Sequence, residues 1–202
     1  MEGAGPALLL DLDGVLVEST AAVERAWTWW AGGRGLDPAR VIRHAHGRPT
    51  IDTVSRFAPT ADRDREVARV EERQRTDVTG LTALPGALDL LTGPRHLAVV
   101  TSCQAALARA RLTAVGLPIP AVLVTSDRLE RGKPDPEGYL LAAAELGTLP
   151  AACTVVEDSP AGIAAGKAAG MRVLAVRSSH PDERLGEADV IVSDLTEVIE
   201  LV

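Results

Sequence analysis

Carboxylate, hydroxyl and lysine side chains stand at four places where an apolar run ends or a helix is about to begin. They are Asp11 and Asp13 after ALLL, Thr101 and Ser102 after LAVV, Lys133 in RGKPDPEGYL, and Glu157 and Asp158 after CTVV. Each stretch alone is typical of a turn or a helix start, because Asp, Ser and Thr form turns and cap helices. Together they would supply four carboxylates, a hydroxyl, free backbone amides and a lysine.

Such a set of groups has a defined chemistry. Carboxylates at this density need a cation, and a set of oxygen ligands suits Mg²⁺, which keeps several waters and binds phosphate. A hydroxyl, backbone amides and a lysine suit the oxygens of a phosphate group. The combination predicts a phosphoryl-transfer site with Mg²⁺ as its cofactor.

These four places can meet only if the elements before them lie side by side. Apolar runs predict strands and the segments between them predict helices: strands at 7–10, 97–100, 121–124, 153–156, 172–176 and 189–192, helices at 104–115, 135–147, 160–169 and 194–201. Near-continuous apolar strands that alternate with helices indicate a parallel sheet covered on both faces. We therefore expect an α/β fold with a doubly wound parallel sheet, whose strand ends share one edge.

The alternation of strands and helices breaks between residues 15 and 83. No strand is expected there, and helical patterns occur at 19–33, 38–44, 49–57 and 61–79. The simplest division is a core domain of residues 1–14 and 84–202, with a helical cap domain of residues 15–83 inserted after the first strand. An insert at this point lies over the sheet edge where open α/β sheets bind their ligands.

Composition narrows the classes of partner. The net charge of -7 and the pI near 5.1 argue against nucleic acid or an anionic membrane as a partner. Two cysteines suggest no disulfide framework, so a reducing cytoplasm is the expected location. The N-terminus does not resemble a signal peptide, and no apolar stretch approaches the roughly 20 residues of a membrane span. A monomer or small homo-oligomer with a small phosphorylated substrate is expected.

Four motifs in this chain resemble the successive motifs of the haloacid dehalogenase superfamily. They are DLDGVLVES, VVTS, GKPDPEGYLLAAAELG and VVEDSPAGIAAGKAAGM, in the family's order and with compatible spacing from residue 11 to residue 171. The resemblance implies a doubly wound core with a cap inserted after the first motif, and the segment 15–83 fits a helical cap.

The resemblance also implies roles for single residues. Asp11 would be the nucleophile that attacks phosphorus, and Asp13 would protonate the leaving oxygen and then deprotonate the attacking water. Thr101 and the backbone amide of Ser102 would bind the phosphoryl group. Lys133 would neutralise phosphate and the developing negative charge.

The resemblance implies a metal site as well. Mg²⁺ would be held by the Asp11 carboxylate, the Asp13 backbone carbonyl and Asp158, with Glu157 beside it.

Two other reactions of this superfamily are weighed against phosphate hydrolysis. Asp13 argues against the dehalogenases, which lack this second aspartate because they have no leaving oxygen to protonate. The β-phosphoglucomutases begin with a similar motif and carry a histidine ten residues after the acid/base aspartate, where this chain has Val23. In those mutases the histidine favours transfer to sugar over transfer to water, so its absence points to hydrolysis. The mutase stays as the alternative reaction.

Residues of the expected cap are candidates for substrate contacts. The run RHAHGRPTIDTVSRFAP resembles the cap of phosphatases that act on small sugar and polyol phosphates. Arg48 could meet a substrate hydroxyl or a second anionic group, and His46, Thr50 and Glu18 could add hydrogen bonds. The alternative is that they only cap and solvate a helix start. Phosphoglycolate is an alternative substrate.

Proteins without enzymatic activity can also gather acidic groups, a hydroxyl and a lysine on an α/β sheet, as receiver domains do. Receiver domains have no helical insert between the first strand and the site, which argues against that class. A degenerate phosphate-binding regulator is disfavoured because all the motif residues are intact.

Outside the motifs, Trp27 and Trp30 share one helix face by their spacing, which favours packing within the cap.

Overall fold

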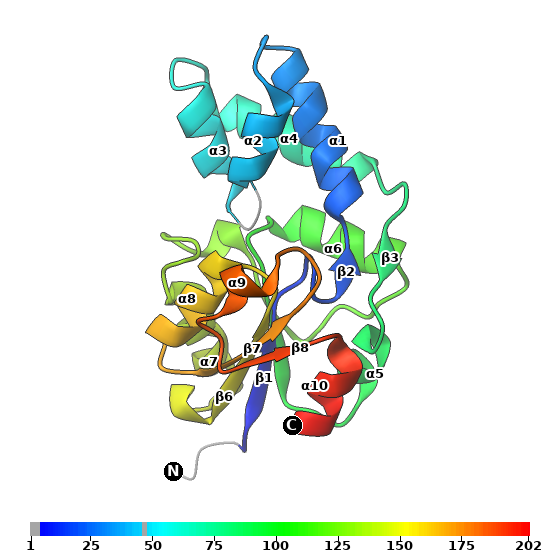
Figure 1. The fold of residues 1–202 in the computed structure, drawn as a ribbon, viewed down its shortest axis with the longest axis vertical. Helices are drawn as coiled ribbons and strands as arrows, with labels where there is room; N and C mark the ends of the chain where they lie inside the picture. The colour runs from blue at the N-terminus through cyan, green and yellow to red at the C-terminus, as the bar shows by residue number, and fades with distance from the viewer. Residues whose placement is uncertain (1–4, 46–47) are drawn as a thin grey trace.

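The computed structural model describes residues 5–45 and 48–202, and its centre is a six-stranded parallel sheet (Figure 1). The strand order is β5-β4-β1-β6-β7-β8. The strands are β1 (Ala7–Leu10), β4 (Leu97–Val100), β5 (Val122–Val124), β6 (Cys153–Glu157), β7 (Arg172–Val176) and β8 (Val190–Val192). β1 pairs with β4 on one side and β6 on the other, so the three predicted motif strands are neighbours.

Helices cover both faces of the sheet, which confirms the predicted fold class. One face carries α5 (Ala87–Thr92), α6 (Ala105–Ala114) and α10 (Leu195–Leu201). The other carries α7 (Glu137–Leu146), α8 (Pro160–Ala168) and α9 (Asp182–Leu185). Two short 3-10 helices, η1 (Ser126–Arg128) and η2 (Pro150–Ala152), lie in the connections that lead from β5 and into β6.

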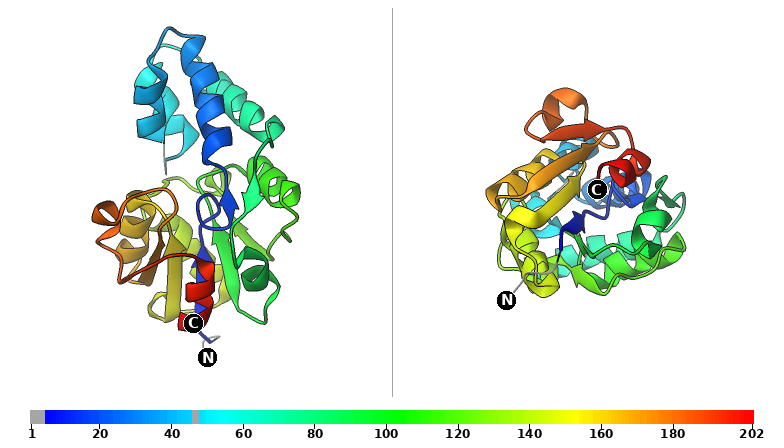
Figure 2. Two further views of the ribbon diagram at one scale, coloured as in Figure 1. Left: turned by 45° about the vertical axis from the view of Figure 1, so that its right-hand side comes forward. Right: turned by 90° about the horizontal axis from the view of Figure 1, so that it is seen from below.

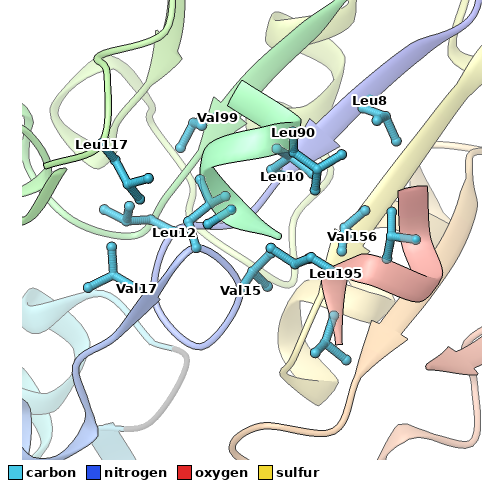
Figure 3. Close-up of a cluster of buried hydrophobic side chains, with 14 of the residues drawn as sticks. Leu8, Leu10, Leu12, Val15, Val17, Leu90, Val99, Leu117, Val156 and Leu195 are labelled. Atoms are coloured by element: carbon cyan, nitrogen blue, oxygen red, sulfur yellow. The ribbon is translucent and has the colours of Figure 1, made fainter. Parts of the chain in front are cut away.

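The first strand shows why its sequence is apolar at every position. Alternate side chains of a strand point to opposite faces. Leu8 and Leu10 join the cluster under α5, α6 and α10, whereas Ala7 and Leu9 join the cluster under α7, α8 and α9. Figure 3 shows Leu8 and Leu10 packed in the first of these clusters, close to Leu90 of α5. β1 is therefore buried on both sides and holds the residues that follow it firmly in place.

Four helices stand above the carboxyl ends of the strands (Figure 1). They are α1 (Thr20–Gly32), α2 (Pro38–Ala45), α3 (Thr50–Phe57) and α4 (Arg63–Thr76), and they share a hydrophobic cluster of their own. Trp27 and Trp30 pack edge to face in it, 5.5 Å apart, which confirms the prediction that they pack within the cap. The Trp30 indole N–H donates to Glu66 of α4 at 2.9 Å.

The expectation of no strand between residues 15 and 83 is wrong. β2 (Val17–Glu18) and β3 (Thr82–Ala83) pair antiparallel, with Val17 opposite Ala83. Strands of two residues are too short to show a hydrophobic period, so the pattern could not reveal them. They place the chain entering the four helices beside the chain leaving them (Figure 2, left). The domain boundaries at 14/15 and 83/84 stay a prediction.

Over residues 5–45 and 48–202, no helix has the length and apolar character needed to cross a membrane.

Candidate active site

A cavity lies between the four cap helices and the carboxyl ends of the strands. On the core side it is lined by residues that follow β1, β4, β6 and β7 and by one residue of α6, and on the cap side by residues of all four cap helices. Among the residues that line it are Asp11, Asp13, Arg48, Thr50, Thr101, Ser102, Lys133 and Asp158 from the predicted set. Others that line it are Val23, Trp27, Gln74, Cys103, Arg111, Ser179 and His180. The structure therefore brings together groups that are far apart in the sequence.

The turn after β1 sets the positions of both aspartates. The backbone N–H of Asp11 donates to the carbonyl oxygen of Val156 at 3.0 Å, so the β1–β6 ladder extends to the first aspartate. Gly14 then has a φ of 78°, in the left-handed region that favours glycine. A Cβ atom here would collide with the carboxylate of Asp158. The glycine that follows Asp13 is thus required for the close approach of the two motifs.

Lys133 joins two buried carboxylates. Its Nζ atom donates to Asp11 Oδ1 at 2.6 Å, to Glu157 Oε1 at 2.6 Å and to the Val100 carbonyl oxygen at 3.2 Å. Burial raises the pKa of Asp11 to about 7; the Lys133 ammonium opposes this effect and the Glu157 carboxylate adds to it. A buried ammonium beside Asp11 is suited to stabilising negative charge at that carboxylate and on a group attached to it.

Glu157 is predicted as part of the metal site, but its two oxygens are already held by five donors. Oε1 accepts from Lys133 Nζ and, at 2.8 Å, from the Tyr139 hydroxyl. Oε2 accepts from the backbone N–H groups of Asp158 and Ser159 and from the Ser159 hydroxyl, all at 3.0–3.1 Å. Burial favours the neutral form, but the Lys133 ammonium and these hydrogen bonds lower the pKa of Glu157. The geometry makes Glu157 a support for Lys133 and for the turn into α8.

Asp158 is the carboxylate of this motif that faces the cavity. The Ser179 hydroxyl, from the loop after β7, donates to Asp158 Oδ2. Burial and the nearby charges of Glu157 and Asp11 raise the pKa of Asp158 well above its usual range. One carboxylate oxygen from each of Asp11, Glu157 and Asp158 lies within 4.8 Å of the other two. A divalent cation would relieve this repulsion, and an all-oxygen donor set fits Mg²⁺.

Asp13 is held at both of its oxygens. Oδ1 accepts from the Ser19 hydroxyl at 2.6 Å, and Oδ2 accepts from the Arg111 guanidinium and from the Cys103 thiol, the latter at 3.2 Å. Arg111 lies on α6 and is 2% exposed. Sequence reasoning missed this partner of Asp13. The available signal was that Arg111 occupies the apolar face of α6 beside Leu107, where a charged residue is unexpected.

Thr101 and Ser102 lie at the end of β4. The backbone N–H of Thr101 donates to the Val124 carbonyl oxygen at 2.9 Å, which extends the β4–β5 ladder to this residue. Its hydroxyl oxygen accepts from the backbone N–H of Cys103 at 3.1 Å. Thr101 is therefore fixed in orientation, while Ser102 is half-buried at the cavity wall.

The cap residues that were predicted to contact the substrate lie in different places. Arg48 and Thr50 line the cavity, and Arg48 is exposed. Glu18 is not among the described residues that line it; its carboxylate accepts from the backbone N–H of Thr20 at 2.8 Å. This contact gives Glu18 a local role at the start of α1, and its substrate contact stays a prediction. His46 lies outside the described residues. Ser179 and His180, which sequence reasoning did not select, line the cavity.

Comparison with known proteins identifies the family of the chain. The sequence profile of the haloacid dehalogenase-like hydrolases matches residues 6–170. Hexitol phosphatase A of Escherichia coli (strain K12) is 44% identical over 200 residues, which cover 94% of this chain and 91% of that protein. The 2-deoxyglucose-6-phosphate phosphatase 1 of Saccharomyces cerevisiae is 33% identical over 216 residues, covering 94% and 88%.

A solved structure has a similar fold. The putative β-phosphoglucomutase from Thermotoga maritima superposes with a TM-score of 0.72 at 28% identity, covering 98% of this chain and 99% of that chain. The matched profile spans the four motifs except Met171, the last residue of the fourth, and both relatives above are phosphatases. The chain is therefore an enzyme of the phosphoric monoester hydrolase class, and it belongs to the haloacid dehalogenase-like hydrolases.

Proposed function

We propose that the protein is a Mg²⁺-dependent phosphatase that hydrolyses a small phosphorylated sugar or polyol through an aspartyl-phosphate. The observation that carries the proposal is the convergence of Asp11, Asp13, Thr101, Lys133 and Asp158 on one cavity beneath the cap helices. This set combines a carboxylate nucleophile, an acid/base group, phosphate-binding donors and two carboxylates for a cation. Each of these parts has a role in phosphoryl transfer through a covalent intermediate.

In the first step Asp11 attacks phosphorus, a bond from its carboxylate oxygen to phosphorus forms, and the bond to the leaving oxygen breaks. Asp13 donates a proton to that oxygen, so the product leaves as an alcohol. In the second step a water molecule attacks the aspartyl-phosphate, Asp13 takes its proton, and Asp11 is regenerated as phosphate departs. Lys133 stabilises the charge at Asp11 in both steps, because its ammonium lies 2.6 Å from Oδ1.

The carboxylates of Asp11 and Asp158 and the backbone carbonyl of Asp13 would hold Mg²⁺. The cation supplies charge neutralisation for the phosphoryl oxygens, so that a carboxylate can approach a phosphate dianion.

Hydrolysis is favoured over mutase chemistry by the residue at position 23. Val23 lines the cavity at the start of α1, and its side chain offers no hydrogen bond donor or acceptor there. A phosphate acceptor held inside the cavity, as a mutase requires, would lack this polar contact, whereas water needs none. A β-phosphoglucomutase-like transfer is kept as an outcome of the test.

The substrate class rests on the cap side of the cavity and on the relatives. Arg48, Thr50 and Gln74 place polar groups around the cavity, where they could meet hydroxyl groups of a sugar or polyol. The relatives named above are a hexitol phosphatase and a 2-deoxyglucose-6-phosphate phosphatase. Phosphoglycolate has a carboxylate that could meet Arg48 but no hydroxyl groups for Thr50 and Gln74, so we place it behind the sugar and polyol phosphates. The cytoplasmic location stays a prediction.

A panel of phosphate esters tests the proposal. Phosphate release is measured for hexitol phosphates, hexose 6-phosphates, glycerol phosphate, phosphoglycolate and β-glucose 1-phosphate, with Mg²⁺ or with EDTA. We expect the sugar and polyol phosphates to be hydrolysed only with Mg²⁺. Asp11→Asn should lose at least about a thousandfold in rate, because covalent catalysis loses its nucleophile.

Three results would contradict parts of this proposal. Activity that survives in Asp11→Asn excludes the aspartyl-phosphate, and full activity in EDTA excludes the cation. Conversion of β-glucose 1-phosphate into glucose 6-phosphate faster than phosphate release would show a mutase.

A further inference from the structure

Arg111 is a buried cation that the proposed reaction does not yet use. Its side chain is 2% exposed, and a charge at such a site is costly unless it is paired and hydrogen-bonded. It donates to Asp13 Oδ2 and, through Nη2, to Gln74 Oε1 at 2.9 Å. Nη1 also lies 2.9 Å from the Cys103 sulfur. These three contacts all go to residues that line the active-site cavity.

The contacts leave a distinct role for each oxygen of Asp13. Oδ2 receives the guanidinium and the Cys103 thiol, so it has little capacity left for the substrate. Oδ1 receives one hydrogen bond, from the Ser19 hydroxyl at 2.6 Å, and keeps a second lone pair. Oδ1 is therefore the oxygen that can exchange a proton with the leaving group. Arg111 fixes the carboxylate plane that aims it.

The same network reaches both ends of the cap. Ser19 follows β2, where the chain enters the four cap helices, and Gln74 lies in the last turn of α4, shortly before the chain returns through β3. Asp13 contacts Ser19 directly and Gln74 through Arg111. A rigid movement of the cap would therefore shift at least one of the groups that orient Asp13.

We propose that Arg111 is a positioning residue, which orients Asp13 for proton transfer and ties this orientation to cap helix α4 through Gln74. The inference rests on the proposed phosphatase function. Arg111 acts through Asp13 and Gln74 and not on the phosphoryl group, so its loss should impair leaving-group protonation more than phosphate binding. An arginine suits this role because its fork of donors can serve two acceptors at once, which a lysine cannot do equally well.

Leaving-group dependence separates this role from a structural one. Phenyl phosphate and p-nitrophenyl phosphate have similar shapes, but phenolate is the poorer leaving group and gains more from protonation. For Arg111→Met we expect kcat/KM on phenyl phosphate, which reports the step that releases the leaving group, to fall about 10- to 100-fold. This is at or below the low end of the roughly 10²- to 10⁴-fold that general acid catalysis contributes, because Asp13 itself remains. On p-nitrophenyl phosphate kcat/KM should fall less than about fivefold. The inhibition constant of inorganic phosphate should change less than about twofold, because Thr101 and Lys133 remain.

Further variants refine the test. Arg111→Lys should recover part of the lost rate on phenyl phosphate, because it keeps the charge beside Asp13. Gln74→Met should show the same preference for the better leaving group with a smaller loss, and Gln74→Glu should retain more activity than Gln74→Met because it keeps an acceptor for Arg111. The control is Arg109→Met, which removes an exposed arginine from the same helix.

The outcomes distinguish this inference from the proposed function. If the wild-type protein hydrolyses neither aryl phosphate nor any sugar phosphate, the proposed function fails and this inference with it. If the wild type is active but Arg111→Met lowers kcat/KM for both aryl phosphates by the same factor, Arg111 is only structural and the inference alone is overturned. A large rise in the phosphate inhibition constant would make Arg111 a phosphate ligand, which also overturns it.

Discussion

At the scale of single residues, Glu157 and Lys133 show how this site holds charges in a dry environment. Glu157 is fully buried and Lys133 is 8% exposed. The ammonium lies 2.6 Å from a carboxylate on each side, and the remaining lone pairs of Glu157 are filled by hydroxyl and backbone donors. A buried ion pair is stable only when its members are satisfied in this way. The complete set of donors around Glu157 therefore fixes where Lys133 can point.

Glu157→Gln tests this arrangement. Glutamine has one acceptor oxygen where glutamate has two. Its NH₂ group would therefore face some of the donors that now bind the second carboxylate oxygen. We expect a loss of about 3–5 kcal/mol in the free energy of unfolding, measured with denaturant at neutral pH in EDTA. The matched control is Glu145→Gln, which breaks a half-exposed pair with Arg128 and should cost less than about 1 kcal/mol. Equal losses of unfolding free energy in the two variants would show that the donors around Glu157 stabilise the protein no more than a surface ion pair does.

At the scale of elements, helix α4 makes two polar contacts with its neighbours, one with the core and one within the cap. Gln74 reaches Arg111 of α6, as described above. One turn earlier, Glu71 is buried beneath the helix, with a hydrogen bond to the Thr50 side chain. Burial raises the pKa of Glu71 to about 7, the bond from Thr50 opposes this effect, and the nearby charge of Asp127 adds to it. Glu71 thus lowers the stability of the folded protein by an amount that depends on pH.

The pH dependence of stability follows from the direction of this pKa shift. A raised carboxyl pKa means that the folded protein binds the proton more tightly than the unfolded chain, so the folded state is penalised once the group ionises. The penalty grows as the pH rises from about 4.5 to about 7 and is constant above that. Glu71→Gln should therefore stabilise the protein by about 2–3 kcal/mol above pH 7 and by nothing below about pH 4.5.

Thermal unfolding of the wild type and of Glu71→Gln across this pH range checks the prediction. Glu72→Gln is the control, because Glu72 is exposed on the same helix and bonds Arg75 only at the surface. A stabilisation that is the same at every pH would argue against a shifted pKa at Glu71.

At the scale of the whole molecule, the acidic groups of the active site lower the stability of the cation-free protein. Asp11, Glu157 and Asp158 place like charges close together under a covered sheet edge, and such repulsion destabilises a fold unless a cation is present. Without a cation, Asp158→Asn should raise the free energy of unfolding at neutral pH by about 1–2 kcal/mol. An amide is neutral without taking up a proton, so it avoids the penalty that the raised pKa of Asp158 imposes on folding.

Addition of Mg²⁺ should reverse this order. The wild type gains stability in proportion to the logarithm of the Mg²⁺ concentration once the site fills, since a ligand that binds only the folded state stabilises it. Asp158→Asn should gain much less, and Asp64→Asn, at an exposed position on α4, should behave as the wild type. Scanning calorimetry in EDTA and in a Mg²⁺ series measures both effects. An Asp158→Asn protein that is less stable than the wild type in EDTA would contradict the repulsion.

Much of the fold and the motif residues could be predicted from the sequence, because the patterns that indicate them extend over only a few neighbouring residues. Each strand of the sheet contains a short apolar run, and each motif follows such a run or begins a helix. Parallel strands share one edge for their carboxyl ends, so Asp11, Thr101 and Asp158 could be expected together without coordinates. The paired strands β2 and β3 were not predicted, because a strand of two residues shows no hydrophobic periodicity.

Only the tertiary structure decided how these groups are used. Arg111 lies 98 residues from Asp13 and 37 residues from Gln74, and no local pattern relates positions so distant. The saturation of Glu157 by Lys133, the side chain of Tyr139 and the start of α8 depends likewise on packing between elements. The sequence by itself determined which chemical groups stand at the strand ends, because secondary structure is read over a few residues. Their partners were decided by the packing of β1, α6 and α4, because hydrogen bonds and ion pairs act over a few ångströms in space whatever the distance along the chain.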